Sequence, residues 1–143
     1  MKKIIASLVA AAAIAVIFNA PVKACEVTDP NGILSEINEE RAQRGEKPLT
    51  VDSELSRAAL IRAEEASIMF SHGRPNGAQW FSVSNFAYGE NLAYATIGEN
   101  VVDMWMSSPA HADNILYGEF KTTGLACYTA PDGYVYLCQL FGY

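Results

Sequence analysis

The sequence predicts a single α+β domain in which helices precede and flank a small antiparallel sheet. Apolar residues recur at helical spacing through the first half of the folded region, and β-forming residues surround a Pro-Asp-Gly turn near the C-terminus. No internal repeat, low-complexity tract or linker-like segment divides residues 25–143. A chain of this length forms one core and leaves no room for a second domain.

The first 24 residues are expected to be an export signal and not part of the domain. Lys2 and Lys3 precede an apolar run over residues 4–18, and Val22-Lys23-Ala24 resembles the site that a signal peptidase cleaves. The apolar run is too short and wrongly flanked for a spanning helix. We therefore expect cleavage after Ala24 and a domain over residues 25–143 that is secreted or periplasmic and not transmembrane.

Cleavage at this point would leave Cys25 at the new N-terminus, which raises two alternatives. The residue could carry the lipid of a bacterial lipoprotein, or it could remain a free or intermolecularly paired thiol. Lys23 differs from the small, uncharged residues typical of lipoprotein cleavage sites. A lipid anchor at Cys25 is thus the disfavoured alternative.

The charge balance excludes two classes of partner. The full sequence has a formal charge of −6, which becomes −9 when the three lysines of the leader are removed. An acidic surface repels phosphate backbones and anionic lipid headgroups. We therefore expect neither nucleic acid nor an anionic membrane surface as a partner, and the identity of an extracellular ligand or protein partner stays open.

Two helices are expected to open the domain. Asp29-Pro30 provides an N-cap and a first helical residue, and Gly45 stands where the first helix would stop. Thr50 or Asp52 can cap a second helix that runs to about Phe70. Small residues at helical spacing along this second helix indicate close packing.

The second half is expected to alternate short helices and strands. Thr96 and Glu99 form a capping-box pattern before a third helix. Ser108-Pro109 ends that helix and can start a fourth that carries His111. Residues 86–95 could supply a strand, although periodicity alone does not settle this.

A β-hairpin is expected to close the chain around Pro131-Asp132-Gly133. Cys127 and Cys138 flank the turn segment from Thr129 to Gly133, and we expect them to be directly opposed residues of the hairpin. The oxidising compartment outside the cell favours pairing of such cysteines. The sequence therefore predicts a Cys127–Cys138 disulfide.

Two histidines and a glutamate are the candidates for chemistry. His72 and His111 lie in turn-rich stretches, and Glu90 follows a glycine in Tyr88-Gly89-Glu90-Asn91-Leu92. Two imidazoles and one carboxylate suit zinc and would leave a fourth position open. The alternative is two satisfied, partly exposed histidines and a surface glutamate. No elbow for a serine nucleophile is present, and the cysteines are poorly placed for nucleophilic catalysis.

Four aromatic residues gather just before the Gly-Glu-Asn segment: Trp80, Phe81, Phe86 and Tyr88. If exposed, they would form the wall of a binding groove, because aromatic faces stack on sugars and apolar ligands. If buried, they would belong to the core. Burial is the expected outcome.

The order of these residues resembles bacterial members of the CAP superfamily, the group of cysteine-rich secretory, antigen 5 and pathogenesis-related proteins, also called SCP domains. The resemblance covers nearly the whole mature chain from about Gly32. It rests on Asn38, Arg41, Gly45, Pro48-Leu49, Leu55, Ala58-Ala59, Ser71-His72, Gly89-Glu90-Asn91-Leu92, Trp105, Ser108-Pro109-Ala110-His111-Ala112-Asp113-Asn114-Ile115-Leu116 and Gln139-Leu140-Phe141-Gly142.

The resemblance implies an α-β-α sandwich with a central cleft open to solvent. His72 looks like the family's first cleft histidine, Glu90 like its first glutamate, and His111 like the histidine of the bacterial S-P-x-H pattern. Asn91 and Asn114 are expected at the same cleft. Ser108 stands where eukaryotic members carry a second glutamate, so a metal site formed by His72, His111 and Glu90 is the most that the resemblance supports.

The resemblance implies two functions of different class. The first is a secreted module that binds a ligand, an envelope component or a protein partner through the cleft, with no cofactor required. The second is a metal-assisted hydrolase in which a divalent ion such as zinc activates water and Glu90 either ligates the ion or acts as base. Catalytic residues stay unassigned, because members of one fold differ in function.

Overall fold

The computed structural model describes residues 27–143, so the expected signal peptide, its cleavage site and Cys25 lie outside the described residues. No helix within residues 27–143 combines the length and the apolar character needed to cross a bilayer. The elements, in chain order, are α1 (Pro30–Gln43), β1 (Thr50–Val51), α2 (Ser53–Ile68), the 3₁₀ turn η1 (Trp80–Val83), β2 (Gly89–Ala95), α3 (Val101–Met106), α4 (Pro109–Leu116), β3 (Thr122–Thr129) and β4 (Val135–Gly142).

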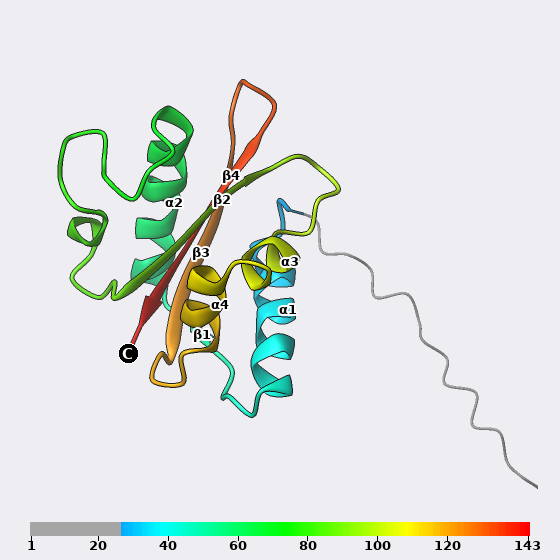
Figure 1. The fold of residues 1–143 in the computed structure, drawn as a ribbon. Coiled ribbons are helices and arrows are strands. Elements are labelled where there is room, and N and C mark those ends of the chain that lie inside the picture. Colours follow the sequence, from blue (N-terminus) through cyan, green and yellow to red (C-terminus); the bar gives the residue numbers. More distant parts are fainter. Residues whose placement is uncertain (1–26) are drawn as a thin grey trace, which may run out of the picture.

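These elements form three layers around one four-stranded sheet (Figure 1). The strand order is β1-β3-β4-β2, with antiparallel pairing of β2 to β4 and of β4 to β3. Helix α2 packs on one face of the sheet, and α1, α3 and α4 lie on the other. The α+β class and the α-β-α sandwich are therefore confirmed. The short β1 adds a parallel pair with β3 that the sequence analysis did not predict.

Most helix boundaries follow the predicted caps. The side chain of Asp29 accepts a hydrogen bond from the backbone N–H of Asn31, and that of Asp52 accepts from the N–H groups of Glu54 and Leu55. The predicted cap of α3 is wrong. Asn100, and not Thr96, caps this helix by accepting from the N–H groups of Val102 and Asp103.

Thr96 and Glu99 instead close the turn that leads into α3. The carboxylate of Glu99 accepts from both the backbone N–H and the hydroxyl of Thr96, at 2.6 Å and 2.8 Å. These bonds lower the pKa of Glu99. The capping-box pattern thus identified a real side-chain contact, but the helix begins one residue after Asn100.

The sheet separates two apolar clusters. Trp105, Ile115 and Phe141 belong to the cluster under α1, α3 and α4, and Leu55 and Leu140 belong to the cluster under α2. The α2 side is built from small residues, which lets this helix approach the sheet closely. The small members of this cluster are Ala58, Ala59, Ala63, Ala66 and Ala126.

A buried arginine connects α1 to the chain around α4 and β3. Arg41 is fully buried and donates to the backbone carbonyls of Lys47, Ile115, Tyr117 and Phe120 at distances between 2.6 Å and 3.3 Å. Burial lowers its pKa, an effect that the charge of Glu46 opposes. The guanidinium satisfies carbonyls that the ends of these elements leave without helical or sheet partners.

The predicted Cys127–Cys138 disulfide is wrong. In the β3–β4 register Cys127 opposes Leu137, while Cys138 opposes Ala126. This offset of one position sends the two side chains to opposite faces of the sheet, because successive residues of a strand alternate. Cys127 packs against the cluster under α1, α3 and α4, and Cys138 lies fully buried in the cluster under α2. Cys127 and Cys138 are therefore not bonded to each other.

Candidate functional site

Strand β2 is the edge strand that organises the candidate site, and its side chains alternate between the two faces. Glu90 and Leu92 point toward α2, where Glu90 meets Arg62 and Leu92 joins the apolar cluster. Asn91 and Ala93 point toward α3 and α4. Adjacent residues of the predicted Gly-Glu-Asn segment therefore serve different sides of the molecule.

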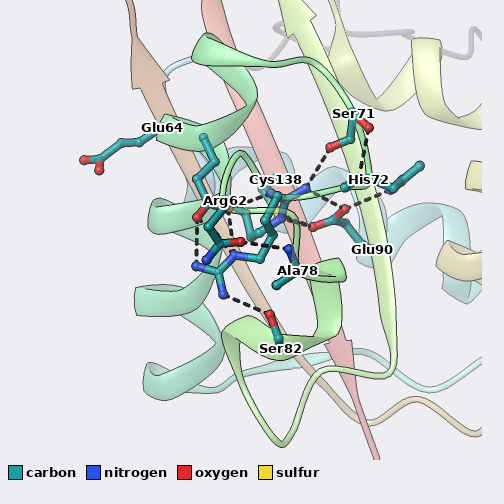
Figure 2. Close-up of polar contacts among 12 residues, drawn as sticks. Arg62, Glu64, Ser71, His72, Ala78, Ser82, Glu90 and Cys138 are labelled. Carbon is teal, nitrogen blue, oxygen red and sulfur yellow. Dashed lines mark hydrogen bonds and ion pairs between the residues drawn. The ribbon is translucent and has the colours of Figure 1, made fainter.

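The carboxylate of Glu90 is the centre of a buried ion pair (Figure 2). Arg62 donates from Nε to Glu90 Oε2 at 2.7 Å and from Nη2 to Glu90 Oε1 at 3.1 Å. The Arg62 side chain is 0% exposed and that of Glu90 is 1% exposed. A bidentate pair so well shielded fixes both partners, since each charge is costly to bury alone.

Further groups complete the surroundings of Arg62. Its Nη1 donates to Glu65 at 2.7 Å, and its Nη2 donates to the carbonyl of Ser71 at 2.9 Å. Burial alone would lower the pKa of Arg62, but the hydrogen bonds to Glu90 and Glu65 outweigh burial and raise it. Arg74 also pairs with Glu65, donating to its Oε1 atom from Nε and Nη2. Arg62 thereby joins α2, strand β2 and the loop that follows α2.

His72 is held at the surface by the buried carboxylate. Its Nδ1 lies 2.8 Å from Glu90 Oε1, while its side chain remains 58% exposed. A carboxylate that already pairs with arginine accepts hydrogen bonds and does not donate them, so Nδ1 must carry the hydrogen. In the neutral imidazole Nε2 is then an acceptor, presented by a ring whose orientation is fixed.

His111 lies on the α4 side of the same strand. Its Nδ1 is 2.8 Å from the hydroxyl of Ser108, the residue that caps α4. Burial lowers the pKa of His111, and the charge of His72 lowers it further. The two imidazoles therefore lie close enough to interact electrostatically, and His111 is neutral near pH 7.

Two asparagines and a tryptophan attach α3 and α4 to the edge of β2. Asn91 donates to the carbonyl of His111, and Asn114 donates to the Asn91 side chain and to the carbonyl of Glu90. Trp105 Nε1 donates to the carbonyl of Leu92 at 3.1 Å. Asn114 and Trp105 thereby occupy carbonyls of an edge strand, which blocks pairing with another strand there.

An apolar pocket of about 470 Å³ adjoins this edge. Its walls come from the end of α2, from β2, from α3 and from the β3–β4 turn, with His111 among them. Pockets with mostly apolar walls and a few polar groups are typical ligand sites. The lining residues are Phe70, Leu92, Ala93, Tyr94, Thr96, Glu99, Met104, Trp105, His111 and Tyr134.

The donor set does not fit the predicted metal ion. Both oxygens of Glu90 already accept hydrogen bonds from Arg62, and one of them also meets His72 Nδ1. An ion at this carboxylate would have to displace a buried guanidinium. Within residues 27–143 no group of three or more His, Cys, Asp or Glu side chains is arranged to hold a metal ion. A site formed by His72, His111 and Glu90 stays a prediction without structural support.

The aromatic residues before β2 were expected to be buried, but most of them are exposed. Phe81, Phe86 and Tyr88 are each more than half exposed, and Trp80 packs partly against the cluster under α2. Phe81, Tyr88 and Trp80 line a shallow hollow of about 360 Å³. The segment has a 3₁₀ turn and loops instead of a longer element, so most of its rings are left at the surface.

Sequence reasoning missed Arg62, the residue that fixes the site. A signal was present, because Arg62 follows Ala59 by three positions and precedes Ala66 by four, on the small apolar stripe of α2. A charged residue at a core position predicts a buried partner of opposite charge. Phe70, Tyr94 and Tyr134 were also missed, since only the fold brings their three segments together.

The order of the sheet and the helices on both of its faces define an α-β-α sandwich, with a histidine on each side of its edge strand β2. Residues 34–141 match the model of the cysteine-rich secretory protein family, CAP. The chain therefore belongs to the CAP family.

A curated relative and solved structures agree with this assignment. The uncharacterized protein YkwD of Bacillus subtilis (strain 168) is 34% identical over 97 residues, a stretch that covers 62% of this chain and 38% of YkwD. The chain thus spans well under half the length of that relative.

Two bacterial structures share the fold. An outer surface protein from Borrelia burgdorferi is similar at a TM-score of 0.64 and 20% identity, over 83% of this chain and 97% of that one. An extracellular protein with an SCP domain from Bacillus anthracis str. Ames is similar at a TM-score of 0.60 and 18% identity, over 78% of this chain and 41% of that one. Identities this low show the fold alone.

Proposed function

We propose that the chain is an exported CAP module that binds a small, largely apolar ligand in the cleft along β2. The observation that carries the proposal is the pocket of about 470 Å³ that His111 and Trp105 line. Export rests on the apolar leader of the sequence. It is also supported by relatives whose names describe an outer surface protein and an extracellular protein.

The polar half of the cleft supports binding through fixed groups. His72 is oriented by Glu90, and His111 by Ser108, so each ring presents its Nε2 side with little freedom of orientation. Ordered polar groups beside an apolar wall bind a ligand with a small entropic cost. The apolar pocket would supply affinity, and His111, which lines it, would select ligands by hydrogen bonding, with His72 held by Glu90 as a second polar group outside that lining.

The hydrolase alternative has less support. Its base or metal ligand was Glu90, and that carboxylate is buried in a pair with Arg62. Both of its oxygens accept hydrogen bonds from Arg62 and its side chain is 1% exposed, so this carboxylate is poorly placed to reach a substrate or an ion. Glu90 acts in our proposal as the group that positions His72.

The pocket predicts saturable binding of a neutral apolar dye. N-phenyl-1-naphthylamine, titrated into the mature protein and followed by fluorescence, is expected to bind one molecule per chain. Met104→Glu should weaken this binding by at least tenfold, because Met104 lines the pocket and the dye would have to desolvate the new carboxylate.

Ile97→Glu is the matched control. Ile97 is 79% exposed and lies outside the pocket lining, so the same change there should leave dye binding unaltered. Far-UV circular dichroism of both variants checks that they are folded. Absence of saturable binding to the wild type, or equal losses in the two variants, would refute the proposed function.

A further inference from the structure

Three aromatic rings form a corner in the lining of the pocket. Phe70 and Tyr134 each stand nearly perpendicular to Tyr94, at 89° and 88°, with ring centroids 4.9 Å and 5.5 Å away. All three rings line the pocket and are between 40% and 50% exposed. Perpendicular aromatic walls are the arrangement by which aromatic cages surround quaternary ammonium groups.

The charges around the pocket favour one sign of ligand. Among the described residues, the pocket lining contains no Lys or Arg, and its ionised group is the carboxylate of Glu99. Burial, together with the neighbouring His72, lowers the pKa of His111, so the ring that lines the pocket favours its neutral form near pH 7. An anion such as a fatty-acid carboxylate would find no counter-charge in this lining, and the acidic protein would repel it.

A second carboxylate lies near the aromatic corner. Asp132 accepts a hydrogen bond from the hydroxyl of Tyr136 at 2.8 Å, and the Tyr136 ring centroid is 6.0 Å from that of Tyr94. Aromatic faces with carboxylates nearby attract cations more strongly than rings alone. The interior of the pocket is apolar, with Leu92, Met104 and Trp105 in its walls.

We infer that this pocket binds an organic cation of the alkyl-trimethylammonium type, with the ammonium group against Phe70, Tyr94 and Tyr134 and the alkyl group against Leu92, Met104 and Trp105. The inference rests on the proposed function, because it names the ligand class of the same pocket. The positive headgroup would gain cation–π attraction and the field of Glu99. The alkyl chain would gain apolar burial.

Three compounds with the same alkyl chain test the inference directly: hexyltrimethylammonium, hexanol and hexanoate. Isothermal titration calorimetry with the wild-type mature protein is expected to give hexyltrimethylammonium at least tenfold higher affinity than hexanol, with hexanoate the weakest. Tyr94→Leu should remove most of the preference for the cation, and Tyr94→Phe should retain it, because only an aromatic face attracts the ammonium group. Tyr88→Leu, at an exposed ring outside this pocket, should change nothing.

The outcomes separate this inference from the proposed function. If the naphthylamine dye binds and Met104→Glu blocks it, but the three hexyl compounds bind equally or the anion binds best, the inference is wrong and the binding pocket stands. If the wild type binds neither the dye nor any hexyl compound, both are wrong. The wild-type comparison decides the question even if a Tyr94 variant fails to fold.

Discussion

Replacing Arg62 by methionine is expected to destabilise the protein by about 3–5 kcal/mol. The change leaves the Glu90 carboxylate buried at 1% exposure without its cation, and it removes the donors to Glu65 and to the carbonyl of Ser71. Urea denaturation followed by tryptophan fluorescence measures the loss in the free energy of unfolding.

Two further variants show whether the loss comes from the ion pair. Arg57→Met changes an exposed arginine on the same helix and should stay within about 0.5 kcal/mol of the wild type. The double variant Arg62→Met/Glu90→Met replaces both charges by apolar groups and should recover much of the loss, because no unpaired buried charge remains. Equal effects of Arg62→Met and Arg57→Met would contradict the role assigned to the pair.

Gly124→Ala is expected to be the other large effect, a loss of about 3 kcal/mol or more. A Cβ atom at Gly124 would overlap the carbonyl carbon of Leu55 and the backbone nitrogen of Ser56, in the first turn of α2. No rotamer change relieves a clash with backbone atoms, so α2 would have to move away from β3. Thermal and urea unfolding measure the loss, and weak or insoluble expression would be consistent with it.

Gly73→Ala is the matched control for this prediction. A Cβ at Gly73 meets only the hydroxyl of Ser71, at an ordinary contact distance of 3.5 Å. This variant should therefore unfold within about 1 kcal/mol of the wild type. If Gly124→Ala were as stable as Gly73→Ala, the close approach of α2 to the sheet would be wrong.

The parts of the fold that were predictable from sequence are those determined locally. Helix starts are marked by interactions within a few residues. Asp29 and Asp52 accept hydrogen bonds from the first turns of α1 and α2, and the fixed φ angle of Pro109 after Ser108 suits the first turn of α4. The hairpin was predictable for the same reason. Its register was not, because a shift of one position changes the faces of Cys127 and Cys138 while leaving the turn signal almost unchanged.

The candidate site was predictable in part. The ordered motifs predicted His72, Glu90, His111, Asn91 and Asn114 as site residues. The structure pairs Glu90 with His72 on one side of β2 and joins Asn91 to Asn114 and to the His111 carbonyl on the other, and their role in ligand binding stays a prediction. The role of Glu90 was not predictable, because its partner Arg62 comes from a distant helix. The contact among Phe70, Tyr94 and Tyr134 was not predictable for the same reason, since these rings come from the end of α2, from β2 and from the β3–β4 turn.

The tautomer of His72 tests most directly whether Glu90 positions an imidazole or serves chemistry in the cleft. Long-range proton–nitrogen NMR correlation spectra of the mature protein, recorded at a pH where His72 is neutral, assign the hydrogen to one ring nitrogen. The Glu90 hydrogen bond predicts a protonated Nδ1 and an unprotonated Nε2, and Glu90→Ala should abolish this preference. A neutral ring protonated at Nε2 in the wild type, or a tautomer unchanged in Glu90→Ala, would contradict this assignment.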